Sequence, residues 1–409
     1  MDNVKLKVGI QSLLGYLPAI VIKNILDGQI DSKILPSHYK IKTVSLFADI
    51  SGFTKLSESF AKKGRIGPEF LAFSLNRYME QLSKNIKWSL VNIIGKNGGD
   101  IFKFAGDAIL VIWPQTDDLD DSCVRAIQCA LDIQNKLNNV EISPNKRLSV
   151  KIGIGVGECM ILVVGGQFKR CEYLCVGEAL AQACLSETKA TEGGQTICSE
   201  IVKNISNKFI FEEITEGNSH GHETNKDEGK FYKIIKMTGE RVPPKAVAYI
   251  MRTQFNNDKL RDKLPILKSY VPAAVVKYLD LEKESWCKEI RMLGIMFLNL
   301  KVDLSQTRTD EGIQRIQTIV KTVQRCVYRT RGGLNKFLMD DKGSVMLICW
   351  GLPPLSAHDD HIRSVYTGLT LINELKKFGC GAYIGITTGS CFTGVCGTIG
   401  GRREYSLLG

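Results

Sequence analysis

Gly98-Gly99-Asp100-Ile101-Phe102-Lys103-Phe104-Ala105-Gly106-Asp107 and Leu46-Phe47-Ala48-Asp49 are the two stretches that decide the fold of this chain. Each contains a short apolar run that predicts a strand, and each places an aspartate, Asp49 or Asp107, at the edge of that run. A pair of rigidly held carboxylates suits Mg²⁺ on the phosphates of a nucleotide, because this hard ion leaves its other positions to water and substrate. The two stretches therefore indicate a metal-dependent nucleotide enzyme.

Both aspartates also fit ordinary structural roles. Asp49 is typical of a strand-end carboxylate that caps the next turn, and Gly106-Asp107 is typical of a hairpin turn. Taken one at a time, these roles are favoured over metal binding.

The composition permits an enzyme without identifying one. The 409 residues are 44% hydrophobic, which is enough for two globular domains with real cores. The net charge of +11 is scattered along the chain, so it favours a solvated basic surface over nucleic-acid binding.

The cysteines and the apolar segments bear on location. Thirteen cysteines show no paired zinc spacing, and no secretory signal is present, which predicts free thiols in a soluble cytoplasmic protein, with peripheral association with organelles or membranes left open. Leu13–Ile22 is too short for a membrane span and is interrupted by Pro18, so it is interpreted as a packed helix.

An internal repeat is the second strong signal. Ile152–Gly157 recurs as Ile384–Gly389, and Glu172–Gly177 recurs as Glu404–Gly409, both at an offset of 232 residues. Two separate matches at one offset predict one domain written twice, at a period far too long for a solenoid.

Within the first copy, strands and helices alternate with a hairpin between them. Strands are expected at Thr43–Asp49, Ile101–Phe104, Ala108–Trp113, Leu148–Gly155 and Met160–Val164, and helices at about Pro68–Val91, at Ser122–Leu137 and from Gly177. This order predicts an α+β fold. The expected organisation is an N-terminal helical segment (1–36), a first domain (37–236), a connector (237–287) and a second domain (288–409).

These residues resemble the class III nucleotidyl cyclases, in particular the soluble, bicarbonate-responsive adenylyl cyclases. The resemblance rests on Phe47–Thr54 and Gly99–Ala108 in the first copy, and on Asn335-Lys336-Phe337 and Arg403–Ser406 in the second. It implies two pseudo-symmetric domains with a ferredoxin-like βαββαβ core. Their intramolecular interface would hold one active and one degenerate site.

The resemblance also implies the metal site and its chemistry. Asp49, Asp107 and the backbone carbonyl of Ile50 match the ligands of two Mg²⁺ ions, with Mn²⁺ or Ca²⁺ as substitutes at one site. The ions would activate the ribose 3′-hydroxyl and offset charge on the departing pyrophosphate. Asp100 lies in the same block but off the ligand position.

The second copy is expected to recognise the base. Asn299 stands where the first copy has Asp49, which assigns metal binding to the first copy alone, and Asp340 is interpreted as a turn residue. Lys336 matches the lysine that reads N1 of adenine, and Ser406 matches a further base contact; Phe53 and Thr54 complete the expected substrate contacts. Lys336 favours ATP over GTP, although it is also compatible with an ordinary strand-end lysine.

Two departures from the family pattern concern activity and regulation. The family's ribose-orienting asparagine and phosphate-stabilising arginine follow the glycine that matches Gly409, so the second copy is interpreted as truncated and this chain as weakly active. The bicarbonate pocket would use Lys103 and an arginine, but Cys184 occupies the arginine position, which makes bicarbonate a doubtful ligand. Lys103 is equally compatible with an outward-facing hairpin lysine.

Two hypotheses of different class follow. The first is an adenylyl cyclase catalytic region that makes cyclic AMP and pyrophosphate from ATP. The alternative is a cyclase-like nucleotide-binding or dimerisation module that regulates a partner.

Overall fold

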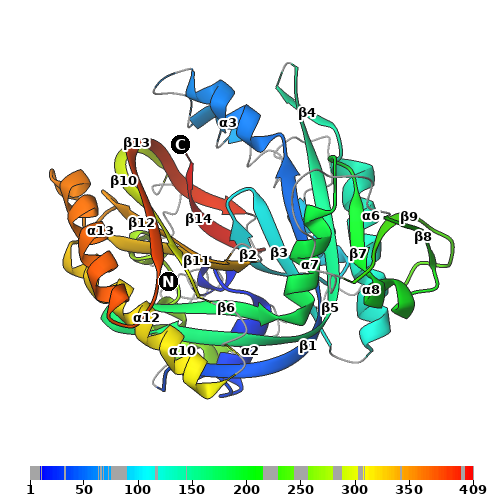
Figure 1. Ribbon diagram of the computed structural model, residues 1–409, viewed down its shortest axis with the longest axis horizontal. Coiled ribbons are helices and arrows are strands. Elements are labelled where there is room, and N and C mark those ends of the chain that lie inside the picture. The colour runs from blue at the N-terminus through cyan, green and yellow to red at the C-terminus, as the bar shows by residue number, and fades with distance from the viewer. Residues whose placement is uncertain are drawn as a thin grey trace.

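The computed structural model describes residues 10 and 12–408, apart from 32–33, 63, 65–66, 68, 72, 75–89, 116–117, 144, 215–228, 244–256, 280–287, 303–306, 308, 341–342 and 398–400. Within this part the chain forms two sheets with helices packed against them (Figure 1). The expected α+β class is therefore confirmed.

The first copy comprises a mostly antiparallel sheet in the order β2-β3-β1-β5-β7-β9-β8, with β4 and β6 also paired to β5. Its strands are β1 (Ser37–Ser51), β2 (Asp100–Ala105), β3 (Ala108–Pro114), β4 (Val140–Ser143), β5 (Lys146–Gly165), β6 (Cys171–Gly177), β7 (Thr196–Ser199), β8 (Phe209–Glu213) and β9 (Phe231–Met237). Its helices are α2 (Ala19–Leu26), α3 (Phe53–Ala61), α5 (Leu90–Lys96), α6 (Leu119–Leu137), α7 (Glu178–Thr188) and α8 (Glu200–Ile205), with a 3₁₀ turn η2 (Gln167–Lys169).

The second copy repeats the order of the first in its sheet, β11-β12-β10-β13-β14. Its strands are β10 (Glu289–Leu300), β11 (Gly333–Asp340), β12 (Gly343–Trp350), β13 (Ala382–Gly397) and β14 (Arg403–Leu408). Helices α12 (Asp310–Arg329) and α13 (Asp360–Lys376) pack on it, and α10 (Asn257–Lys268) and α11 (Ala273–Leu279) precede it.

One sequence prediction about the elements needs correction. The strands expected at Leu148–Gly155 and Met160–Val164 form one continuous strand, β5, because Gly157 and Glu158 stay paired with β1 across the expected break. The helix expected at Pro68–Val91 lies largely outside the described residues, and the described residues 69–71, 73–74 and 90–91 are helical.

Each face of β5 carries a different helix layer. Ile152, Ile154 and Val156 point into a core shared with α6, as alternation along a strand requires. The glycines between them face α7, and a Cβ added to Gly153 would lie 1.9 Å from the carbonyl oxygen of Ala183. Glycine therefore allows α7 to approach the strand backbone closely.

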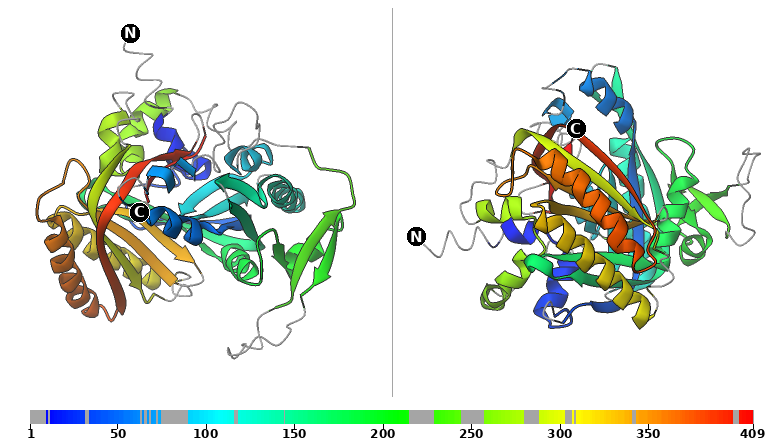
Figure 2. Two further views of the ribbon diagram at one scale, coloured as in Figure 1. Left: turned by 90° about the horizontal axis from the view of Figure 1, so that it is seen from above. Right: turned by 60° about the vertical axis from the view of Figure 1, so that its left-hand side comes forward.

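The two copies complete each other's cores. The outer face of the β5–β6 ribbon packs against α12, and Leu162 and Leu174 belong to the second copy's core. In return the β13–β14 ribbon crosses toward β2, and Phe392 and Leu408 belong to the core of the first copy (Figures 1 and 2). This exchange of ribbons places residues from both copies around the ends of β2 and β11.

Candidate active site

Of the two sequence-predicted metal ligands, Asp49 lies on β1 and Asp107 lies in the turn that leads into the neighbouring strand β3. In the register of β1 with β3, Asp49 is opposite Ala108, the residue that follows Asp107. Gly106 takes φ +72° in the β2–β3 turn, a left-handed conformation that glycine adopts without steric cost. Both aspartates are half-buried, and Ile50 is buried beside them. The fold thus brings Asp49 and Asp107 together at one end of the sheet.

The donor set at this end suits a hard cation. Among the residues that the structure describes, no group of three or more His, Cys, Asp or Glu side chains could hold a metal ion. A cation here would therefore bind the two carboxylates and backbone or substrate oxygens, which is the ligand type that Mg²⁺ takes. Asp100 has a different role, because its Oδ2 accepts a hydrogen bond of 3.0 Å from the Ile20 N–H in the first turn of α2.

Lys336 connects the second copy to this strand end. It lies on β11, is 5% exposed, and its Nζ donates to the carbonyl oxygen of Phe104 at 3.4 Å. Phe104 is three residues before Asp107 in the same hairpin. Glu404 Oε1 of β14 lies 3.8 Å from the same Nζ, so the lysine is held by contacts from both copies.

For the other predicted substrate-binding residues, the structure gives the position in the fold but no contact with the metal-binding end of the sheet. Ser406 follows Glu404 by two residues on β14, so the two side chains share a face of that strand, and Ser406 is half-buried. Phe53 and Thr54 open α3 directly after Gly52, but their side chains lie outside the described part of the structure.

The corresponding strand end of the second copy lacks the acidic pair. Asn299 on β10 is opposite Val345 of β12, at the register that Asp49 occupies in the first copy. Asp340 closes β11 opposite Gly343, and its side chain lies outside the described residues. An amide oxygen in place of a carboxylate makes this end a weaker cation site.

Lys103, the predicted anion-binding residue, points into the protein. Its side chain is 7% exposed, and its Nζ donates to the carbonyl oxygen of Tyr173 at 3.0 Å and lies over the Tyr173 ring. The alternative of an outward-facing hairpin lysine is therefore wrong. Burial lowers the pKa of Lys103 to about 8, against the opposing charges of Glu172 and Glu404.

The surroundings of Lys103 offer little to an anion. Lys103 lines a small cavity of about 30 Å³ whose other described lining residues are uncharged. Cys184, at the position predicted for a second cation, is buried on α7. The nearby Arg170 pairs instead with Glu172 at 2.8 Å.

Arg402 is the functional candidate that sequence reasoning missed. It is 2% exposed and links the second copy to the N-terminal segment and to β2 of the first. Its Nε donates to the Ile101 carbonyl (2.7 Å), its Nη1 to the Gly15 carbonyl (2.7 Å) and its Nη2 to the Phe102 carbonyl (3.2 Å). The repeat offset of 232, which also relates Arg170 to Arg402, was the available signal.

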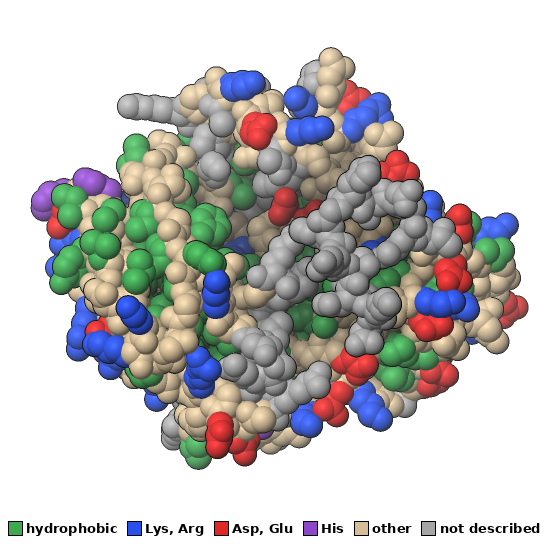
Figure 3. All heavy atoms as spheres, viewed as in Figure 1, with side chains coloured by type: hydrophobic (Ala, Val, Ile, Leu, Met, Phe, Trp, Pro, Cys, Tyr) green, Lys and Arg blue, Asp and Glu red, His purple; other side chains and the backbone are tan. Residues whose placement is uncertain are grey.

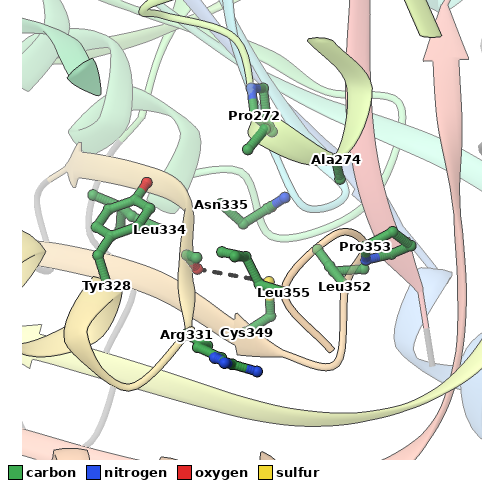
Figure 4. A pocket seen from close by; sticks show the side chains of 12 residues that line it. Pro272, Ala274, Tyr328, Arg331, Leu334, Asn335, Cys349, Leu352, Pro353 and Leu355 are labelled. Atoms are coloured by element: carbon green, nitrogen blue, oxygen red, sulfur yellow. Dashed lines mark hydrogen bonds between the residues drawn. The ribbon is translucent and has the colours of Figure 1, made fainter. Parts of the chain in front are cut away.

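A cavity of about 30 Å³ lies between α11 and the β11–β12 pair (Figure 4). Pro272 and Ala274 line one side of it and Asn335 the other. Gly333 on β11 corresponds to Asp100 on β2, because Gly333 is opposite Cys349 just as Asp100 is opposite Ile112. Glycine has no side chain, so the space that the Asp100 side chain fills in the first copy is left unfilled in the second. We interpret this cavity as a packing difference between the copies.

Comparison with known proteins identifies the family. Residues 37–235 match the family of adenylate and guanylate cyclase catalytic domains. The chain belongs to the class III nucleotidyl cyclases. It is 25% identical over 383 residues to adenylate cyclase type 10 of Oryctolagus cuniculus and 25% identical over 382 residues to that of Homo sapiens.

These alignments cover 90% of this chain but 23% of each relative, so the chain spans about a quarter of the length of these curated cyclases. A class III adenylyl cyclase-like ATP-binding protein from Pseudomonas aeruginosa has the same fold, with a TM-score of 0.57 and 11% identity over 99% of this chain and 86% of that one. The match of the whole chain to one cyclase-like fold agrees with the paired arrangement of its two sheets. No helix among the described residues of this cyclase is long and apolar enough to cross a membrane.

Proposed function

We propose that this chain is an adenylyl cyclase catalytic region that converts ATP to cyclic AMP and pyrophosphate where its two copies meet. One observation carries the proposal. Lys336 of the second copy reaches the carbonyl oxygen of Phe104, on the strand that leads to Asp107 of the first copy. This contact supports a composite site in which a lysine that reads the base lies near a metal-binding pair.

In this site the residues act by binding and orientation. Asp49, Asp107 and the Ile50 carbonyl would hold two divalent ions, Mg²⁺ with Mn²⁺ or Ca²⁺ as substitutes. The bound ions would lower the pKa of the ribose 3′-hydroxyl and offset charge on the leaving pyrophosphate. Lys336 Nζ would donate to N1 of adenine in exchange for its contact with Phe104, and the Ser406 hydroxyl would lie beside the base. Phe53 and Thr54 would follow the metal site at the start of α3.

Lys336 supports ATP as the substrate, because adenine presents an acceptor at N1 where guanine presents a donor. Binding of GTP would leave the buried ammonium facing an N–H, which costs a buried hydrogen bond and adds repulsion. The carboxylate of Glu404 lies 3.8 Å from the Lys336 Nζ and provides the opposite charge beside it.

The test is cyclic AMP production from ATP with Mg²⁺ or Mn²⁺, measured for the chain and for its Lys336→Ala variant. Removing one charge-assisted hydrogen bond to the base predicts roughly a 10- to 100-fold rise in KM for ATP. Lys40→Ala is the matched control, since Lys40 is exposed and forms an ion pair with Glu158. The proposal is contradicted if the affinity for ATP changes neither when divalent cations are removed nor when Lys336 is replaced by alanine.

A nucleotide-binding module without turnover is the second candidate. It is favoured by the asymmetry between Asp49 and Asn299 and by the similarity to the Pseudomonas protein, which is described as ATP-binding and adenylyl cyclase-like. Metal-dependent ATP binding without any formation of cyclic AMP would decide for the module. The bicarbonate hypothesis is tested in the same assay, and the small cavity beside Lys103 predicts no activation.

A further inference from the structure

Arg402 carries a buried positive charge directly before β14. Its side chain is 2% exposed, and among the residues that the structure describes it forms no ion pair. Burial of a charge costs free energy unless its hydrogen-bonding groups find partners. The guanidinium donates to neutral oxygens of the first copy and the N-terminal segment, namely the carbonyls of Gly15, Ile101 and Phe102 and the hydroxyl of Tyr173. Arg402 is therefore a cross-link between segments that lie far apart in the chain.

Two of these acceptors belong to β2, the edge strand of the first sheet. Carbonyl groups on the outer side of an edge strand have no partner strand. The register irregularity between Ile101 and Lys103 allows successive carbonyls, those of Ile101 and Phe102, to face the same donor. Near the other end of β2, the Phe104 carbonyl accepts from Lys336 Nζ. The second copy thus holds β2 at two points, one through Arg402 and one through Lys336.

The N-terminal segment holds the start of β14 from a further direction. The Gly15 carbonyl accepts from Arg402 Nη1 at 2.7 Å, and the Ser12 hydroxyl accepts from Arg403 Nη1 at 2.7 Å. A Cβ on Gly15 would lie 3.1 Å from both Arg403 Cδ and the carbonyl oxygen of Gly401, so the absence of a side chain permits this close approach. The start of β14 is therefore fixed by β2 and by the N-terminal segment together.

The corresponding arginine of the first copy behaves differently. Arg170 precedes Arg402 by the repeat offset of 232 and pairs with Glu172 at 2.8 Å. Side chains two residues apart on a strand share a face, so Arg402 could pair with Glu404 in the same way. The carbonyl contacts of Arg402 direct it elsewhere, and the Glu404 carboxylate lies 3.8 Å from Lys336 Nζ. The partners of the arginine therefore decide which cation this carboxylate faces.

We propose that Arg402 is a positioning residue for base recognition, an inference that rests on the proposed adenylyl cyclase function. Bound to β2 and to the N-terminal segment, Arg402 fixes β14 on the first copy and leaves the Glu404 carboxylate to orient the Lys336 ammonium. Lys336 is thereby kept beside the strand that leads to Asp107, where the proposed function requires N1 of adenine. Arg402 acts through Lys336 and does not itself contact the nucleotide, as a supporting residue behind a binding group does.

The experiment measures how the whole chain with Mg²⁺ binds 3′-deoxy-ATP, 3′-deoxy-GTP and tripolyphosphate by calorimetry. The deoxynucleotides lack the attacking hydroxyl, and tripolyphosphate lacks the base, so it reports on the metal-binding half alone. Arg402→Met should weaken 3′-deoxy-ATP about tenfold, because the charge-assisted contact of Lys336 with the base is lost. The preference for adenine over guanine should fall by a similar factor, and tripolyphosphate affinity should change by less than about twofold. Arg402→Lys keeps the charge without the forked donors, so its loss should be smaller and of the same kind.

Glu404→Gln tests the route by which Arg402 acts. This variant should also weaken 3′-deoxy-ATP, and the double variant with Arg402→Met should lose no more than the weaker-binding single variant, because both changes act through Lys336. Ser12→Ala is the matched control. It removes the hydrogen bond from Arg403 that also ties β14 to the N-terminal segment but leaves the contacts of Arg402 in place, so 3′-deoxy-ATP affinity should be unchanged.

Three results would overturn this inference. Arg402→Met could weaken 3′-deoxy-ATP and tripolyphosphate equally, or weaken neither, and Arg402 would then serve the fold alone. The losses in the double variant could also be additive, which would separate Arg402 from Glu404. Failure of the proposed function gives a different result, because the unmodified chain would then bind 3′-deoxy-ATP with an affinity that depends neither on Mg²⁺ nor on Lys336.

Discussion

The two copies have the same strand order but differently covered sheets. In the first, α7 lies so close to β5 that a Cβ on Gly155 would come within 2.4 Å of the Ala179 carbonyl oxygen. In the second, a Cβ on Gly385 or Gly389 of β13 would meet nothing within 4 Å. Phe297 on β10, the counterpart of the half-buried Phe47, is 53% exposed. One glycine pattern thus serves close packing in one copy and faces open space in the other.

The helices show the same contrast. When α6 and α13 are aligned from their N-caps Asp118 and Asp359, Val124 corresponds to Val365. Val124 is 5% exposed and Val365 is 50% exposed. An outward apolar stripe runs along α13 beside the open sheet face and comprises Ile362, Val365, Tyr366, Leu369 and Ile372 (Figure 3). Repetition of a sequence pattern therefore preserves the strands without preserving what covers them.

The largest predicted difference between the copies concerns the metal site. Asp49→Asn should lower cyclic AMP formation by at least about 10²-fold, because a carboxylate that holds positive charge at the phosphates is lost. Asn299→Ala in the second copy should change the rate by less than about twofold. Both variants are measured with Mg²⁺-ATP, alongside ATP affinity with and without the cation. Equal losses in the two variants would remove the distinction between an active and a degenerate site.

The glycines of β5 and β13 test the packing directly. Gly153→Ala should destabilise the fold by about 3 kcal/mol, since the new methyl group must displace the backbone of α7. Gly385→Ala should cost nothing and could stabilise by up to about 1 kcal/mol through reduced freedom of the unfolded chain. Urea unfolding measures both. A large cost at Gly385 would mean that a segment packs on the face that the described residues leave open.

The buried lysine of the first copy gives a pH-dependent prediction. Below pH 8 Lys103 is charged in both the folded and the unfolded chain, so its burial cost is fully present. Between pH 8 and its ordinary pKa of 10.5 only the unfolded chain keeps the proton, so the Lys103 contribution to stability rises with pH, by up to roughly 3 kcal/mol.

Lys103→Met should abolish this rise. The free energy of unfolding is measured for the variant and for the unmodified chain below and above pH 8, and the difference between the two proteins should change across that pH. The exposed Lys40→Met is the control and should give a constant difference. A difference for Lys103→Met that does not vary with pH would show that the ammonium is solvated.

The smallest effect is expected on the outer face of α13. Val365→Thr should change the free energy of unfolding by less than about 0.5 kcal/mol, because the added hydroxyl meets water. Val124→Thr buries the same hydroxyl and should cost about 1–2 kcal/mol. Thermal or urea unfolding compares the two. Matching costs would indicate that the stripe on α13 is covered in solution.

Much of this arrangement was predictable from local patterns. The apolar run before Asp49 and the Gly106-Asp107 turn predicted the strand and the hairpin, and the register confirms that they adjoin. The break expected within β5 was wrong, because pairing with β1 continues through Gly157 where local propensity favours a stop. The inward direction of Lys103 was left open, since alternation along a hairpin does not say which face is covered.

The chain's sequence by itself determined the duplication, the α+β class and the acidic pair, because each follows from short-range periodicity or from a repeat at constant offset. Only the tertiary structure decided that Lys336 contacts the strand that leads to Asp107 and that Arg402 joins three segments. These contacts join residues from different strands, ribbons or copies. Their geometry depends on how twisted sheets exchange ribbons, which no single stretch of sequence encodes.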